Sequence, residues 1–186
     1  MAAPLLVTPR LVIRAFQAID ATRVQLLAGD AAIADTTLNI PHPYADGMAE
    51  AWIASHEDHF KSGEQATFAI VLRPTDELIG AVGLTFTATH ARAELGYWIG
   101  KPYWSQGFCT EAARAVLGYA FMARGVNRVQ ATHLSRNAAS GRVLQKLGMQ
   151  HEGTARQYFR KNGRFEDVER YAILRDRYLA TVQDDL

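Results

Sequence analysis

Residues 103–112 (Tyr-Trp-Ser-Gln-Gly-Phe-Cys-Thr-Glu-Ala) form the segment with the most direct chemical meaning in this chain. The segment leaves an apolar, aromatic stretch, turns at Gly107 and enters an amphipathic helix. Backbone N–H groups in the first turn of a helix have no partner inside the helix, and the helix dipole is positive there. The pattern therefore predicts a phosphate-binding site. Taken alone, it also fits a glycine turn before an ordinary helix.

Two further positions carry groups that can move protons. Glu94 lies at the start of an aromatic strand, and alternation along that strand places Glu94, Gly96 and Trp98 on one face. Asn137 is a good helix N-cap, and Ser140 follows it in the first helical turn. The histidines of His56-Glu-Asp-His59 are three residues apart rather than four and no third ligand is evident, so no metal site is predicted.

The elements that must position these residues follow from length and composition. With 186 residues, the chain is long enough for one domain with a substantial core, and we expect residues 1–186 to form a single domain. Apolar residues make up 48% and charged residues 21%, as in ordinary soluble proteins. The formal net charge is +1 and Lys or Arg never form a run of five. These features argue against nucleic-acid or membrane partners.

The expected compartment follows from three sequence features. A single cysteine, Cys109, excludes an internal disulfide and fits a reducing environment. The N-terminal segment 1–7 lacks the basic start and long apolar stretch of a signal peptide. No apolar run approaches the roughly 20 residues that span a bilayer. We therefore expect a cytoplasmic protein.

Hydrophobic periodicity predicts a mixed α/β order in which two helices follow the first strand. Expected strands cover residues 11–16, 66–72, 77–87, 93–99 and 126–133, and a final hairpin has arms at 149–160 and 168–174. Expected helices cover residues 19–28, a segment capped by Asp46 and ended by Gly63, a segment after Gly107 ended by Gly125, and one from Asn137 to Gly148. Residues 36–46 are expected to be loop. Gly96 and Gly100 indicate a bulge or a close approach to the backbone.

This order, together with three segments, resembles the GNAT N-acetyltransferases, and within them the Rim-type (RimJ/RimL) ribosomal-protein N-terminal acetyltransferases. Residues 94–99 are similar to the family's central strand, residues 103–112 to its acetyl-CoA motif (Q/R-x-x-G-x-G/A), and residues 137–149 to its N-x-x-S…K-x-G-F/M segment. Trp104 and Cys109 depart from the motif. The resemblance implies a single-domain GNAT fold: a mixed, mostly antiparallel sheet with a splayed central strand flanked by helices.

The resemblance also implies acetyl-CoA as the cofactor. Backbone groups of residues 106–110 would hold its pyrophosphate, and the edge formed by residues 97–99 would pair with its pantetheine arm and polarise the thioester carbonyl. The residues expected to bind the cofactor are Tyr97, Trp98, Ile99, Trp104, Ser105, Gln106, Gly107, Phe108, Cys109, Thr110, Asn137, Ser140, Arg142 and Lys146.

Cys109 has two interpretations. A thiol at a helix N-terminus has a lowered pKa and can act as a nucleophile. We therefore expect Cys109 to alkylate readily in the free protein and to be protected by coenzyme A. The preferred interpretation is a small residue in a slot that usually holds Gly or Ala, with no chemical role.

Family mechanisms imply two catalytic residues. Glu94 would take the proton of the amine, often through water; the alternatives are a salt-bridging carboxylate or a charge that binds the acceptor. Ser140 would protonate the departing thiolate, because the tyrosine that many members place four residues further along is Leu144 here. A solvated serine is the alternative. Residues expected to shape the amine slot are His42, Tyr44, Phe86, Trp98 and Tyr158.

The resulting prediction is an acetyl-CoA-dependent N-acetyltransferase acting by direct attack in a ternary complex. The preferred acceptor is a protein N-terminal amine, such as that of a ribosomal protein; a small amine (amino acid, polyamine or antibiotic) is the alternative. A non-catalytic acyl-CoA-binding domain is a second class. A nucleotide-binding protein is disfavoured because neither G-x-x-x-x-G-K-[ST] nor G-x-G-x-x-G occurs. The sequence leaves a monomer or a homodimer open.

Overall fold

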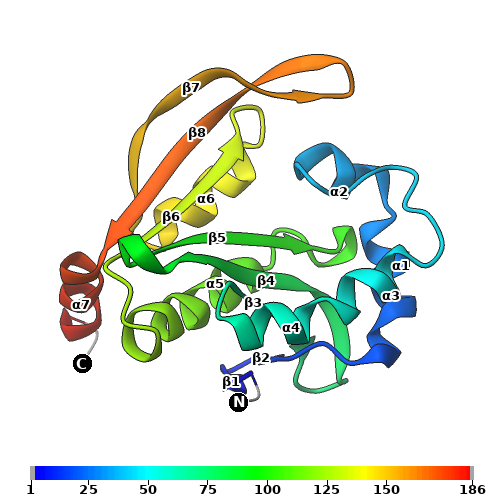
Figure 1. Ribbon diagram of the computed structural model, residues 1–186, viewed down its shortest axis with the longest axis horizontal. Helices are drawn as coiled ribbons and strands as arrows, with labels where there is room; N and C mark the ends of the chain where they lie inside the picture. The colour runs from blue at the N-terminus through cyan, green and yellow to red at the C-terminus, as the bar shows by residue number, and fades with distance from the viewer. Residues whose placement is uncertain (1–2, 185–186) are drawn as a thin grey trace.

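One eight-stranded sheet forms the frame of the molecule in the computed structural model, which describes residues 3–184 (Figure 1). The strand order is β1-β2-β3-β4-β5-β6-β8-β7. The strands are β1 (Leu6–Val7), β2 (Leu11–Arg14), β3 (Gln65–Leu72), β4 (Glu77–Thr87), β5 (Arg92–Ile99), β6 (Arg128–Leu134), β7 (Gln150–Lys161) and β8 (Arg164–Leu174). Only β5 and β6 pair in parallel, which confirms the predicted mixed, mostly antiparallel sheet.

Helices cover both faces of this sheet, and the long β7–β8 hairpin rises away from the body (Figure 1). The helices are α1 (Ala21–Ala28), α2 (Ala31–Thr36), α3 (Met48–Ala54), α4 (His56–Ser62), α5 (Phe108–Gly118), α6 (Ala138–Lys146) and α7 (Arg175–Asp184). Short 3-10 turns lie at η1 (Ala18–Asp20), η2 (Ala88–His90) and η3 (Lys101–Tyr103), and a π-helical turn, η4 (Tyr119–Ala123), extends α5.

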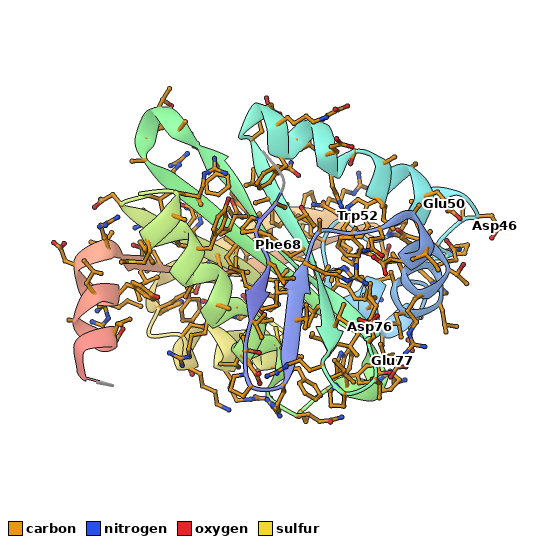
Figure 2. The ribbon with its side chains drawn as sticks, turned by 90° about the horizontal axis from the view of Figure 1, so that it is seen from below. Asp46, Glu50, Trp52, Phe68, Asp76 and Glu77 are labelled. Atoms are coloured by element: carbon orange, nitrogen blue, oxygen red, sulfur yellow. The ribbon has the colours of Figure 1, made fainter. Side chains whose placement is uncertain are left out.

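Two apolar clusters hold the layers together. The larger joins one face of the sheet to α5 and α6 and includes Phe68 and Phe121, both fully buried. Figure 2 shows Phe68 in the interior of the molecule. The smaller joins the opposite face to α1, α2 and α3 and includes Val24 and Trp98. Burying this apolar surface on both faces is the main term that stabilises such a layered domain.

The parting of β5 from β6 is the feature of the fold that matters most for function. The two strands pair only where Arg92–Glu94 meets Arg128–Gln130, so within the described residues 3–184 residues 95–99 have no strand partner on the β6 side. On the other side, β5 pairs with β4 without interruption from Arg92 to Ile99. The predicted splay of the central strand is therefore confirmed.

The bulge expected at Gly96 or Gly100 is wrong, because the β4–β5 register has no shift; the irregularity lies between Ile70 and Val71 of β3. A Cβ on Gly100 would lie 2.9 Å from the Leu27 side chain, so the close approach predicted there does occur. A Cβ on Gly96 would meet nothing within 4 Å. Gly96 therefore leaves open space beside the backbone where β5 departs from β6.

Several predicted boundaries need correction. The helix predicted after Asp46 is two helices, α3 and α4, divided at Ser55. Its N-cap is Gly47, at φ 82°, whereas Asp46 lies exposed at the edge of the molecule (Figure 2). Residues 31–36, partly predicted as loop, form α2, and α7 was not predicted. These segments are short or weakly amphipathic, so tertiary packing decides their conformation.

His56 on α4 makes the stability of this fold sensitive to acid. Burial against Phe16 and Trp52 lowers its pKa to about 4, with a smaller contribution from His59. Between pH 6.5 and 4 the histidine binds a proton in the unfolded chain but stays neutral in the folded protein. The free energy of unfolding therefore decreases as the pH falls through this window. After discounting for partial solvent contact, we expect a loss of about 2 kcal/mol.

Urea unfolding at pH 7 and pH 4.5 measures this loss. The variant His56→Phe keeps an aromatic ring between Phe16 and Trp52 but cannot bind a proton, so its stability should depend less on pH than that of the wild type. His42→Gln, which changes an exposed histidine, should keep the wild-type dependence. An equal pH dependence in the wild type and His56→Phe would assign the effect to other groups.

No helix within residues 3–184 has both the length and the hydropathy required to cross a membrane.

Candidate active site

The loop before α5 presents a row of unpaired backbone donors. Ser105 (φ 61°) and Gly107 (φ 81°) both adopt the left-handed conformation that turns the chain into the helix. The first backbone bond of α5 runs from the N–H of Glu111 to the carbonyl of Gly107, 3.0 Å away. Within residues 3–184, the N–H groups of residues 105–110 make no hydrogen bond. Together with the helix dipole, these donors fit a phosphate or a pyrophosphate.

Arg10, which directly precedes β2, holds this loop against the N-terminal part of the chain. Its guanidinium donates to the carbonyl of Gln106 (3.0 Å), pairs with Glu111 (2.6 Å) and lies 4.5 Å above the Phe108 ring. Burial opposes ionisation of Glu111, but hydrogen bonds from Thr8 and Arg10 outweigh it and lower the pKa of Glu111. Sequence reasoning missed Arg10, which lies almost a hundred residues from its partners and carries no local signal.

Trp104 explains one departure from the family motif. Its indole N–H donates to the carbonyl of Ile99, 2.6 Å away, at the end of the splayed edge. This bond joins the predicted phosphate loop to β5. The carbonyl of Ile99 is therefore already engaged, and the edge left for a ligand lies nearer Leu95–Trp98.

Ser140 and Tyr97 meet across the gap between β5 and α6. Their hydroxyl oxygens are 2.8 Å apart. Asn137 caps α6 as predicted, since its side-chain oxygen accepts from the N–H of Ser140 (3.2 Å). Leu144 is fully buried in the core, so the position that holds a tyrosine in many family members carries no proton donor here.

Burial is the main reason why the pKa of Tyr97 is raised, and the nearby Cys109 adds to it, while the bond to Ser140 acts in the opposite direction. The phenol of Tyr97 therefore stays protonated over the working range of pH. Sequence reasoning assigned Tyr97 only a backbone role, because the partner of its hydroxyl is 43 residues away in the chain.

Glu94 is exposed on the face of the sheet that carries α1, α2 and α3, at the last residue before β5 leaves β6. The only hydrogen bond of its side chain among residues 3–184 is a 3.5 Å contact from the side-chain amide of Gln130. It forms no ion pair within the same residues, so the salt-bridge alternative has no support. A carboxylate in this position is free to meet an incoming amine or a water molecule.

Trp98 and Tyr44, both expected near the acceptor, belong to the smaller apolar cluster on the Glu94 face. The backbone carbonyl of Tyr44 accepts from the Gln25 side chain (2.7 Å), and the ring of His42 lies 3.1 Å from the carbonyl of Gly29. These contacts hold the loop before α3 against the end of α1.

The other two residues expected in the amine slot, Phe86 and Tyr158, lie on β4 and on β7. Phe86 packs against the larger cluster on the opposite face of the sheet, where the guanidinium of Arg124 covers its ring at 4.0 Å. Its place in a slot with Tyr44 and Trp98 is therefore wrong, because residues 86 and 98 face different layers. Tyr158 is exposed on β7, with the Arg170 guanidinium 4.9 Å from its ring centroid. It lies on the β7–β8 hairpin, and its place in the amine slot stays a prediction.

Arg136, which sequence reasoning passed over, joins three elements beside Asn137. Its guanidinium pairs with Asp35 (2.7 Å) at the end of α2 and with Glu166 (3.1 Å) on β8. The amide of Asn137 also donates to the carbonyl of Thr36 (3.2 Å). The first turn of α6 is thus tied to α2 and to the hairpin, which fixes where Ser140 lies.

The remaining cofactor candidates, Arg142 and Lys146, are exposed on α6. Lys146 lines an open groove with Thr110 and Arg114 along α5, and the Arg114 guanidinium donates to its backbone carbonyl (2.8 Å). The structure gives neither Arg142 nor Lys146 a side-chain hydrogen bond within residues 3–184. Both cations therefore remain available to an anion from solvent.

The lowered pKa expected for the thiol of Cys109 is wrong, because partial burial raises this pKa to about 12. A protonated thiol reacts slowly with electrophiles, and desolvation of this side chain exceeds the effect of the helix dipole. We expect iodoacetamide to label Cys109 of the folded protein about a hundredfold more slowly than the urea-unfolded chain at pH 7.5. Mass spectrometry of timed samples measures both rates. Labelling as fast as that of the unfolded chain, suppressed by coenzyme A, would restore the earlier expectation.

Comparison with known proteins agrees with this geometry. Residues 10–150 match the family described as "Acetyltransferase (GNAT) domain". The chain is 33% identical over 138 residues to the N-acetyltransferase p20 of Bacillus licheniformis, covering 73% of this chain and 78% of that protein. It is 28% identical to the [ribosomal protein uS5]-alanine N-acetyltransferase of Escherichia coli, over 68% of this chain and 66% of that one.

The fold is also similar to that of a solved ribosomal-protein acetyltransferase. RimL, a ribosomal L7/L12 alpha-N-protein acetyltransferase solved in complex with coenzyme A, superposes with a TM-score of 0.86 at 18% identity, covering 94% of this chain and 99% of that chain.

Proposed function

This chain belongs to the GNAT acetyltransferase family and is an acetyl-CoA-dependent N-acetyltransferase, and we propose that its acceptor is the N-terminal amine of a protein. The observation that carries the assignment of the site is the parting of β5 and β6 immediately after Glu94, with Ser140 facing Tyr97 across the gap. We infer that the amine, the thioester and the two proton-handling side chains meet at this gap.

The residues around the α5 loop fit coenzyme A. Six unpaired N–H groups, at residues 105–110, would hold the pyrophosphate, and the exposed Arg142 and Lys146 can approach its other phosphate. The open space above Gly96, on the same face of β5 as Glu94, leaves room for a ligand next to the free edge of this strand. Bound acetyl-CoA supplies the acetyl group as a thioester whose leaving group is a thiolate.

Three groups of the chain each carry out one part of the acetyl transfer. Glu94 accepts one proton from the attacking amine, directly or through water. A backbone N–H on the free edge of β5 stabilises the negative charge that develops on the carbonyl oxygen. Ser140 donates one proton to the departing sulfur. The C–S bond of the thioester breaks as the C–N bond forms; one proton passes from the amine to Glu94 and one from Ser140 to the sulfur. Glu94 then releases its proton to solvent and Ser140 takes one up from solvent, which restores both residues.

Two observations support a protein N-terminus as the acceptor. Glu94 is exposed on an open stretch of sheet, so a flexible chain end can reach it without entering a closed chamber. The E. coli relative named above acts on the alanine of ribosomal protein uS5. The aromatic side chains of Trp98 and Tyr44 lie on the same face and would contact the first residues of the acceptor.

Release of free thiol from acetyl-CoA tests the acceptor, measured with a panel of peptides, amino acids and polyamines. Turnover with peptides that begin with Ala or Ser, and not with the same peptides blocked at the N-terminus, is the expected result. Turnover with small amines alone would move the assignment to metabolite acetylation. Tight binding of coenzyme A by calorimetry, with no turnover on any acceptor, would contradict the proposal and favour a binding domain.

A further inference from the structure

The hydroxyl of Tyr97 has one proton and two acceptors within reach, both on Ser140. Its oxygen lies 2.8 Å from Ser140 Oγ and 3.3 Å from the Ser140 carbonyl oxygen. A carbonyl can only accept, whereas two hydroxyl groups can donate in either direction. The acceptor to which Tyr97 donates therefore determines whether the hydroxyl proton of Ser140 is free to bond another group.

The two arrangements differ in their consequence for Ser140. If Tyr97 donates to the carbonyl, the short contact requires Ser140 to donate to Tyr97, and its proton is occupied. If Tyr97 donates to Ser140 Oγ, the Ser140 proton is free for another acceptor. The 2.8 Å separation is the usual length of an O–H···O bond, and 3.3 Å is beyond the usual range. The geometry favours the second arrangement.

The surroundings maintain this arrangement. Burial keeps the Tyr97 phenol protonated, so it always has a proton to donate. The Asn137 cap fixes the backbone of Ser140, and the positive end of α6 lies at the same place. A hydroxyl that accepts a hydrogen bond also becomes a better donor, because bonds in a chain polarise one another.

We propose that Tyr97 is a positioning residue that directs the Ser140 proton into the gap between β5 and β6. The inference rests on the proposed function of Ser140 as the proton donor to the departing sulfur. Tyr97 itself does not touch that sulfur in this scheme. It orients the serine, and its loss leaves the Ser140 hydroxyl free to rotate toward backbone carbonyls of the first turn of α6.

The first test uses the protein without cofactor. Tyrosine labelled with ¹³C at the ring carbon that bears oxygen reports by NMR whether each phenol donates a hydrogen bond. The resonance missing from Tyr97→Phe identifies Tyr97. We expect this resonance to shift in Ser140→Ala and to be unchanged in Ser135→Ala, which removes a serine that instead bonds Glu169. An identical Tyr97 resonance in the wild type and Ser140→Ala would overturn the proposal.

The second test is kinetic. We expect Tyr97→Phe to lower kcat about tenfold, less than the factor of 10² to 10⁴ that a positioned proton donor itself contributes, and to leave the acceptor KM and the Kd for coenzyme A unchanged. In the Ser140→Ala background the same change should have no further effect, since there is no serine proton left to direct. An equal reduction in both backgrounds, or a change in KM alone, would overturn the inference.

A matched control separates orientation from packing. Tyr171→Phe removes another phenol from the same cluster, whose hydroxyl accepts a hydrogen bond from the Gln145 side chain (3.4 Å), and should leave kcat unchanged. If no acceptor supports turnover, the proposed function fails, and the NMR comparison still decides whether Tyr97 and Ser140 form the pair. If turnover occurs but the two variants act independently, only the inference fails.

Discussion

Glu94→Gln should lower kcat about a hundredfold while the protein remains folded and binds coenzyme A normally. A positioned general base typically contributes a factor of 10² to 10⁴, and the amide cannot accept the amine proton. The substitution preserves shape, and the exposed side chain has one weak contact, to Gln130, so little stability is at risk. Steady-state kinetics over a range of pH measure the effect.

The matched control is Glu57→Gln on α4, an exposed carboxylate that pairs with Lys61 of the same helix (2.6 Å). This variant should keep the kcat of the wild type. If Glu94→Gln raises only the KM of the acceptor and leaves kcat unchanged, Glu94 binds the acceptor and is not the base. That outcome would leave the rest of the site intact and move the proton acceptor to water or to the acceptor itself.

Thr110→Pro should weaken the binding of coenzyme A by tenfold to a hundredfold. Proline has no N–H, so the change deletes one of the unpaired donors at the start of α5. Proline is tolerated in the first turn of a helix because that N–H has no partner inside the helix. Losing one hydrogen bond to a charged group costs about 1.5 to 3 kcal/mol, which corresponds to this change in Kd. Isothermal titration calorimetry measures it without any acceptor.

Thr110→Ala is the control, because it removes the side chain and keeps the N–H. Its Kd should stay within about threefold of the wild-type value, a difference well below that of one charged hydrogen bond. A thermal melt of both variants shows whether α5 is intact. Equal weakening in Thr110→Ala and Thr110→Pro would assign the contact to the threonine hydroxyl and contradict a loop that binds through its backbone.

These variants also separate two ways in which the site could be built. In the first, the chain holds its cofactor through backbone groups that any sequence with the same turn could present. Trp104 and Cys109 are compatible with that arrangement, since the indole donates to the carbonyl of Ile99 and the cysteine side chain packs, partly buried, against the larger cluster. In the second, side chains such as Arg142 or Lys146 carry the affinity. The Thr110 pair distinguishes the two without altering either cation.

The sequence by itself determined the features that depend on neighbours in the chain. Periodicity and caps located β3, β4 and β5, the start of α5 at Gly107 and the Asn137 cap of α6, because each follows from local backbone geometry and hydrogen bonding. The same local motifs indicated the family, the cofactor and the splay of the central strand. Gly107 illustrates the reason, since a left-handed turn before a helix requires little beyond its own residues.

Only the tertiary structure decided features that depend on residues distant in the chain. The place of Cys109 at the start of a helix predicts a lowered thiol pKa, but desolvation by the surrounding side chains raises this pKa instead. Phe86 is an aromatic residue of the kind that could line the amine slot. Only the register of β4 shows that its side chain lies on the sheet face opposite to Trp98. Arg10 and Tyr97 find their partners across 96 and 43 residues. A linear pattern carries no information on such pairs, because packing brings them together only after the sheet and helices have assembled.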